Sequence, residues 1–224
     1  MCIRDRPHVR ISELVIEPSL LPSIDFITSS HNHTDHLDAF TILPILKNSP
    51  HCQLIIPSAN RDFVAGRLQI DPLVPIGLNA GESFIDGNIQ FHAIPAAHNT
   101  LDKNEKGEFL YLGFIIKLGD FVIYHSGDTL YYEGMEEWIN PHKPSIALLP
   151  INGNDPNRKV AGNLNASEAV SLAKACHIPV AIPCHYDLFE FNTADVNIFI
   201  DAAKKADQRC CVLELGGKFS SSEL

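Results

Sequence analysis

The chain has 224 residues, of which 45% are hydrophobic and 20% are charged, a size and composition that suit one sizeable α/β domain and are short for two. Its formal net charge of -10 gives no general attraction to polyanions, and without a strong basic patch this argues against a nucleic-acid partner. Six cysteines without a CxxC pair favour a reduced, cytoplasmic protein, and the lack of an apolar run of about 18 residues argues against a membrane partner.

The opening segment MCIRDRPHVR shows neither a helical nor a strand period. It also lacks the apolar stretch that an export signal needs. We therefore expect residues 1–10 to be a non-native or disordered lead-in to a single domain over residues 11–224.

Apolar, β-branched runs predict strands along the rest of the chain, and apolar residues at helical spacing predict helices. Asn165 with Glu168 resembles a capping box and marks one helix start. The order of hairpins first and strand–helix units afterwards predicts mixed sheets covered by helices. In chain order the predicted elements are a strand over 23–30, a helix over 35–48, a strand over 52–57, a helix over 58–68, a hairpin of 83–86 with 89–95, a hairpin of 109–118 with 121–126, a strand over 145–151, a helix over 165–177, a strand over 179–184, a helix over 194–206 and a strand over 210–215.

The segment HNHTDH carries the densest chemical signal in the chain. His31 and His33 alternate with Asn32 and so project to one side of an extended loop, while Asp35 and His36 are expected on the first turn of the following helix. Neutral imidazole and carboxylate suit zinc, manganese or iron, and the absence of thiolates disfavours a purely structural zinc site. This cluster predicts two neighbouring metal positions.

Three more polar residues each follow an apolar strand, at the end where loops gather into a site in α/β folds. They are His98, Asp128 and His185. Each of the three also has an ordinary explanation when it is taken alone. His98 can be a loop histidine without a ligand role, and Asp128 can cap the next segment. His185 can be a core histidine whose hydrogen bonds are satisfied. Their joint occurrence in these positions favours a shared site.

The order of these seven residues resembles that of the metallo-β-lactamase superfamily, over residues 23–215. Within it, HNHTDHLD, LGFIIK, IYHSGDT, ALLP and IPCHYD are most similar to the L-ascorbate-6-phosphate lactonase group. The resemblance implies an αββα sandwich of two mixed β-sheets flanked by helices. It also implies that His31, His33 and His98 hold one ion, that Asp35, His36 and His185 hold another, and that Asp128 bridges them. The ions would be zinc or manganese.

The chain departs from the family pattern upstream of the histidine cluster. The family builds its first β-hairpins before this loop, whereas 30 residues precede His31 here. We therefore expect the first N-terminal strands to be missing from an N-terminally truncated domain.

The resemblance predicts a lactonase that opens a phosphorylated sugar-acid lactone, such as L-ascorbate 6-phosphate, by attack of metal-bound hydroxide. Asp35 is placed to accept a proton as the intermediate collapses. The alternatives are a metallohydrolase of the phosphodiesterase or phospholipase type, and a non-catalytic metal-binding remnant. The expected partners are a small anionic substrate and a second copy of the chain in a homo-oligomer.

Six further residues are candidates for binding the substrate or for orienting the metal ligands. For each of them the alternative is an ordinary role, either solvated at the surface or packed in the core. Arg158 and Lys159 would meet a phosphate or carboxylate, and Tyr131 and Tyr186 would line the pocket. His125 and Asp187 would orient a ligand imidazole from behind.

Overall fold

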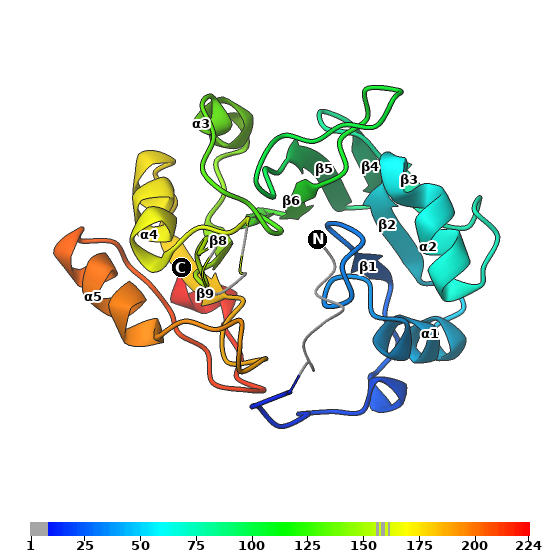
Figure 1. The fold of residues 1–224 in the computed structure, drawn as a ribbon, viewed down its shortest axis with the longest axis horizontal. Coiled ribbons are helices and arrows are strands. Elements are labelled where there is room, and N and C mark those ends of the chain that lie inside the picture. The colour runs from blue at the N-terminus through cyan, green and yellow to red at the C-terminus, as the bar shows by residue number, and fades with distance from the viewer. Residues whose placement is uncertain (1–8, 156, 158–159, 161) are drawn as a thin grey trace.

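The computed structural model describes residues 9–155, 157, 160 and 162–224, and in these residues two sheets lie between helices (Figure 1). The smaller sheet has the parallel strands β1 (Phe26–Thr28), β2 (Gln53–Pro57) and β3 (Ile76–Leu78). The larger sheet follows chain order and contains β4 (Ser83–Asp86), β5 (Ile89–Pro95), β6 (Leu112–Leu118), β7 (Phe121–His125), β8 (Ile146–Pro150) and β9 (Val180–Cys184).

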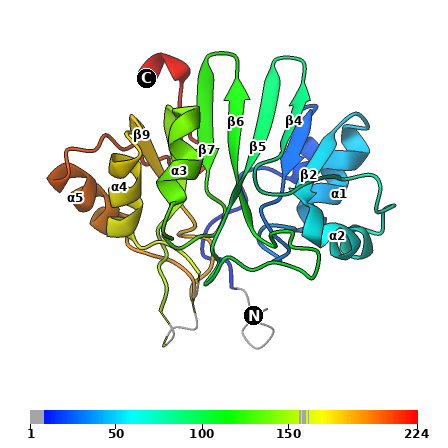
Figure 2. The ribbon, with the colours of Figure 1, turned by 90° about the horizontal axis from the view of Figure 1, so that it is seen from above.

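Helices cover the outer faces of both sheets, as the two views of the ribbon show (Figures 1 and 2). On the smaller sheet lie α1 (Ala39–Asn48) and α2 (Arg61–Leu68). On the larger sheet lie α3 (Met135–Ile139), α4 (Ala166–Ala175) and α5 (Val196–Lys205). Short 3-10 helices are η1 (Pro18–Leu20), η2 (Ser58–Asn60), η3 (Asn140–His142) and η4 (Ser221–Glu223). The predicted αββα sandwich is confirmed, with the difference that the described strands of the smaller sheet are all parallel rather than mixed. Among the described helices, none has both the length and the apolarity to cross a membrane.

The strand β2 shows why its sequence is apolar at consecutive positions. Leu54 and Ile56 pack against α1 and α2, whereas Ile55 packs toward the larger sheet. Alternate side chains of a strand point to opposite faces, and both faces of β2 are covered. A continuous apolar run is therefore what a strand in this layer requires.

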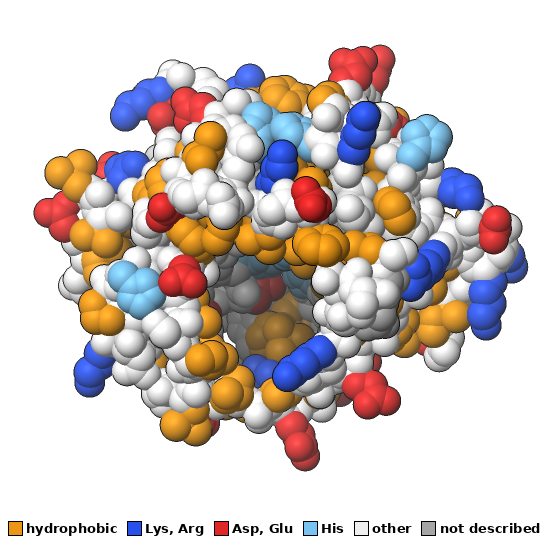
Figure 3. Space-filling model, turned by 180° about the vertical axis from the view of Figure 1, so that it is seen from behind, with side chains coloured by type: hydrophobic (Ala, Val, Ile, Leu, Met, Phe, Trp, Pro, Cys, Tyr) orange, Lys and Arg blue, Asp and Glu red, His pale blue; other side chains and the backbone are white. Residues whose placement is uncertain are grey.

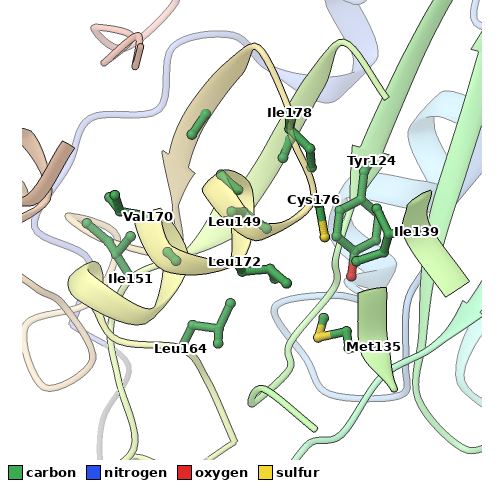
Figure 4. Close-up of a cluster of buried hydrophobic side chains, with 14 of the residues drawn as sticks. Tyr124, Met135, Ile139, Leu149, Ile151, Leu164, Val170, Leu172, Cys176 and Ile178 are labelled. Carbon is green, nitrogen blue, oxygen red and sulfur yellow. The ribbon is translucent and has the colours of Figure 1, made fainter. Parts of the chain in front are cut away.

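A second core lies between the larger sheet and its helices (Figure 4). The Asn165 side chain accepts from Glu168 N, and Glu168 in turn accepts from Asn165 N, so the predicted capping box fixes the start of α4. That start presents one face of α4 to the sheet. The buried side chains labelled in this core are Tyr124, Met135, Ile139, Leu149, Ile151, Leu164, Val170, Leu172, Cys176 and Ile178.

The direction of the strands brings several chain segments to one edge of the larger sheet. β6 is antiparallel to both β5 and β7, so β5 and β7 run the same way, and β8 and β9 are parallel to β7. The carboxyl ends of β5, β7, β8 and β9 therefore share one edge, where loops converge on a site.

Two predicted elements are wrong in detail. The helix expected from Asp35 begins at Ala39, because Asp38 caps it by accepting from Phe40 N at 3.1 Å. The strand expected over 210–215 is only an isolated bridge of Cys210 with Ala181. The strand β3 and the helix α3 were not predicted, because each is too short to show a period.

Candidate metal centre

The histidine-rich loop occupies the connection between β1 and α1. Ser29 N donates to Ile55 O at 2.9 Å, which holds the loop's start to the end of β2. His36 N and Leu37 N both donate to His33 O, so the chain turns sharply just before α1. Asp35 and His36 thus lie in this turn and not in the first helical turn, which corrects the prediction. The turn brings them beside the His31 end of the loop.

The remaining three predicted ligands arrive from the shared edge of the larger sheet. His98 and Asp128 each lie three residues beyond their strands, β5 and β7, and His185 directly follows β9. Ala97 N donates to Thr129 Oγ1 at 3.0 Å and Leu130 N donates to Ala97 O at 2.8 Å. These bonds hold the His98 and Asp128 segments together.

Asp128 lies at the centre of the cluster, with 5% of its side chain exposed. Its Oδ1 lies 3.2 Å from His36 Nε2, and its Oδ2 lies 3.4 Å from His185 Nε2. Its Oδ2 is also 3.9 Å from His31 Nε2 and 4.0 Å from His98 Nε2. One carboxylate thus faces imidazoles from four different positions in the chain.

The other ligand atoms form two groups around this carboxylate. His33 Nδ1 lies 3.2 Å from His98 Nε2, on the side of His31. Asp35 Oδ2 lies 3.4 Å from His185 Nε2 and 3.7 Å from His36 Nε2. Among the residues that the structure describes, three sets have all their ligand atoms within 4.8 Å of one another. They are His31 with His33 and His98, His31 with His36 and Asp128, and Asp35 with His36 and His185.

Burial and mutual repulsion separate the protonation states of these histidines. Burial lowers the pKa of His31 well below its usual value, and burial with the nearby His98 lowers the pKa of His33 to about 4. Burial also opposes charge on His185, but Asp128 and Asp35 outweigh it and raise the pKa of His185 to about 10. In the metal-free protein, therefore, His31 and His33 are neutral while His185 is protonated against the two carboxylates.

The donor set fits a divalent ion. His31 Nε2 and His36 Nε2 are buried and find no aligned hydrogen-bond partner in the described part of the chain. Leaving such atoms unpaired is costly unless a further group binds them. Imidazole nitrogen and carboxylate oxygen without thiolate are suitable ligands for zinc or manganese. The seven residues therefore fit the ions that the sequence predicts.

The other predicted site residues lie in different surroundings. Tyr131 is 52% exposed, and its hydroxyl donates to Glu136 at 3.0 Å. Tyr186 packs partly against the core under α4. Arg158 and Lys159 lie outside the described residues.

His125 and Asp187 were predicted to orient a ligand imidazole, but neither bonds to a ligand imidazole in the hydrogen bonds described. His125 Nδ1 accepts from Gly127 N at 3.1 Å and so supports the backbone before Asp128. Burial, together with the nearby His36, lowers the pKa of His125 to about 4. Asp187 accepts from Thr193 Oγ1 at 3.1 Å.

Sequence reasoning missed three residues that contact the cluster. The Tyr111 ring lies 5.3 Å from that of His31 and 5.1 Å from that of His98, between centroids. Arg67 Nη1 donates to Asn32 O at 2.6 Å, and Ser30 Oγ lies against two ligand imidazoles. No local pattern marks Tyr111 or Arg67, because their contacts join distant parts of the chain.

The surface is hollowed on the face opposite that of Figure 1, as the space-filling view shows (Figure 3). Hydrophobic side chains line much of its rim, and acidic and histidine side chains lie in its depth. The hollow is therefore a concave entry with acidic and histidine side chains in its depth, and with apolar and some basic side chains at its rim (Figure 3).

This fold, with its histidine and aspartate cluster at the sheet edge, defines a protein of the metallo-β-lactamase fold class. The chain belongs to the beta-lactamase superfamily, whose domain matches residues 7–186. It is 32% identical to a UPF0173 metal-dependent hydrolase of Pyrococcus furiosus, over 82% of this chain and 76% of that protein. It is 22% identical to a probable L-ascorbate-6-phosphate lactonase of Escherichia fergusonii, over 96% of this chain and 65% of that protein.

A solved structure shows the same fold. Igni18, described as a metallo hydrolase of Ignicoccus hospitalis, superimposes with a TM-score of 0.67 at 24% identity, over 87% of this chain and 77% of Igni18. The family matches described above make the chain a metal-dependent hydrolase of the beta-lactamase superfamily.

Proposed function

We propose that this hydrolase binds two divalent ions, zinc or manganese, and opens a phosphorylated sugar-acid lactone such as L-ascorbate 6-phosphate in the cytoplasm. The observation that carries the proposal is that two groups of ligands lie on either side of one buried carboxylate, that of Asp128. Shared carboxylates between neighbouring ligand groups are typical of sites that bind two ions.

In this proposal each of the two groups of neighbouring ligands holds one ion. His31, His33 and His98 hold one ion, Asp35, His36 and His185 hold the other, and Asp128 lies between them. When bound, two such ions lower the pKa of a shared water and polarise a carbonyl or phosphoryl oxygen.

Asp35 is the residue proposed to move a proton. Burial opposes its charge, but the hydrogen bond from His185 and the nearby His36 lower the pKa of Asp35 to about 2. The carboxylate is therefore ionised at neutral pH, and its side chain is one-fifth exposed, at 20%. It can accept a proton as the ring-opening intermediate collapses and transfer it to the leaving oxygen.

The substrate class rests on similarity and on charge. The probable lactonase of Escherichia fergusonii aligns with nearly the whole chain, at 22% identity over 96%. A small anionic substrate also suits a site that holds four imidazoles around one carboxylate, since bound ions would leave it net positive. Arg158 and Lys159 remain predicted contacts for the phosphate, and a homo-oligomer remains a proposal without a defined interface.

The test combines metal content with two substrates. The purified protein is analysed for bound elements, then loaded separately with zinc and manganese and assayed against L-ascorbate 6-phosphate and bis-(p-nitrophenyl) phosphate. The Asp128→Asn variant, prepared in the same way, shows whether any turnover belongs to this site.

We expect about two ions per chain and turnover of the lactone alone. Turnover of the diester alone would overturn the lactone assignment in favour of a phosphodiesterase. Metal binding without turnover of either compound would favour a non-catalytic metal-binding protein.

A further inference from the structure

Ser30 lies immediately before the histidine loop and touches one imidazole from each ligand group. Its Oγ is 3.0 Å from His31 Nδ1 and 3.1 Å from His36 Nδ1. Only 5% of Ser30 is exposed, so these contacts are made away from bulk water. One hydroxyl therefore lies behind two rings whose other nitrogens face Asp128, at 3.9 Å for His31 and 3.2 Å for His36.

This arrangement determines which ring nitrogen of His31 and of His36 is available to bind an ion. A histidine that binds an ion through Nε2 carries its proton on Nδ1, and the group that accepts this proton fixes both the tautomer and the ring orientation. A serine oxygen has two lone pairs and can accept two N–H donors at once. With both Nδ1–H groups donating to Ser30, both Nε2 lone pairs point toward Asp128.

The backbone around Ser30 keeps its hydroxyl in place. Leu112 N donates to Ser30 O at 3.0 Å, which ties the residue to the first position of β6. Gly127, with a φ of +62°, packs so closely that an added β-carbon would lie 2.8 Å from Ser30 Cβ. The added carbon would also lie 2.6 Å from Leu112 O, so a side chain at Gly127 would displace both Ser30 and the start of β6, and glycine is required there.

We infer that Ser30 is a positioning residue that sets the tautomer of His31 and His36 together and so couples the two ion positions. The inference rests on the proposed division of ligands, in which His31 and His36 belong to different ions. Loss of the hydroxyl leaves two buried N–H donors without their acceptor, one in each ligand group. Both ion positions are then weakened by a single change outside the ligand set.

The test compares two neighbouring buried serines. Ser30→Ala removes the hydroxyl between the imidazoles, whereas Ser29→Ala removes one that donates to the backbone of His31, at 3.0 Å, from a residue only 2% exposed. Zinc affinity is measured by competition with a chromophoric chelator, and zinc content by elemental analysis. We expect Ser30→Ala to weaken both ions by about 10- to 100-fold. Ser29→Ala loosens the loop backbone at His31 but leaves the acceptor of both imidazoles in place, so it should weaken metal binding clearly less than Ser30→Ala.

A spectroscopic measurement on the unaltered protein does not depend on the variant folding. In the zinc-loaded protein, two-bond ¹H–¹⁵N correlations should show His31 and His36 both protonated at Nδ1. Either ring protonated at Nε2 instead would overturn the inference. So would a Ser30→Ala protein that loses only one ion or that binds both with unchanged affinity. If the unaltered protein binds a single zinc, the two-ion proposal fails, while the tautomers of His31 and His36 still decide whether Ser30 positions them.

Discussion

Gly162 packs directly against the imidazole of His98, so that a β-carbon built on this glycine would overlap the ring. Gly162 has a φ of +81°, in the left-handed region that favours glycine. The bond from Thr129 N to Asn163 Oδ1, at 3.1 Å, places this stretch beside the Asp128 segment. A loop that follows β8 thus helps to hold a predicted ligand that follows β5.

We expect Gly162→Ala to displace His98 and to weaken metal binding by at least about tenfold, the size of effect seen when a ligand's support is lost. The matched control is Gly153→Ala, at a φ of +82° in the same loop, where the added carbon would lie 3.7 Å from Asn165 Cβ in ordinary contact. Both variants carry the backbone strain, so equal metal affinities measured by chelator competition would contradict the prediction.

Arg67 should position the histidine loop from the neighbouring helix. Its Nη1 donates to Asn32 O at 2.6 Å and to Leu37 O at 3.3 Å, so one guanidinium links two carbonyls of the ligand loop. We expect Arg67→Ala to reduce metal affinity several-fold and Arg67→Lys to recover part of it, because the lysine keeps a donor but loses the planar fork.

Arg61 offers a control for this experiment on the same helix. Its Nη1 also donates to two carbonyls, of Pro72 at 2.6 Å and Pro75 at 2.7 Å, away from the histidine loop. Arg61→Ala should lower thermal stability without changing metal affinity. If both alanine variants weaken metal binding to the same degree, Arg67 has no particular role in the loop.

Asp35→Asn removes the proposed proton acceptor and also alters one proposed ligand of the second ion, so activity and metal content are measured on the same sample. We expect kcat on the productive substrate to fall by about 100-fold or more, because the amide cannot accept the proton. Zinc content measured on the same sample should show at least about one ion per chain, because the His31, His33 and His98 group is unaltered. Asp38→Asn is the control, since it removes a charge three residues away and asparagine remains a good helix cap. Full activity in Asp35→Asn with full metal content would exclude the proton-transfer role.

The metal-free protein should lose stability as the pH falls from about 6.5 to about 4. His33 and His125 both have a folded pKa lowered to about 4, mainly by burial, so the unfolded chain binds more protons across this interval. Conversely, the pKa of His185 is raised to about 10 by its carboxylates, and that contribution is lost as the pH rises toward 10. The free energy of unfolding should therefore be largest near pH 6.5.

Urea denaturation in the presence of a chelator, at intervals from pH 4.5 to 9, measures this profile. The His125→Gln variant should show a shallower fall on the acid side, because it removes one of the groups that resists protonation in the folded state. Stability that rises steadily as the pH falls from 6.5 would contradict the assignment of buried, neutral histidines.

Local patterns predicted much of the fold. Alternating and continuous apolar runs located eight of the nine described strands to within a few residues, and Asn165 with Glu168 marked the start of α4. The predicted start of α1 was too early, because apolar spacing does not mark the first helical residue. The bonds from His36 N and Leu37 N to His33 O form a separate turn, and Asp38 caps the helix after it. The 210–215 run is apolar, yet it pairs with β9 only at Cys210.

The sequence by itself determined the residue types of the site, since the order of His31, His33, Asp35, His36, His98, Asp128 and His185 is a chemical pattern that needs no coordinates. Only the tertiary structure decided what supports them. Ser30 against His36, Arg67 against Asn32 and Gly162 against His98 are contacts made by the turn of a loop or across segments distant in the chain. Such contacts depend on how the layers pack, and local propensity and spacing carry no record of that packing.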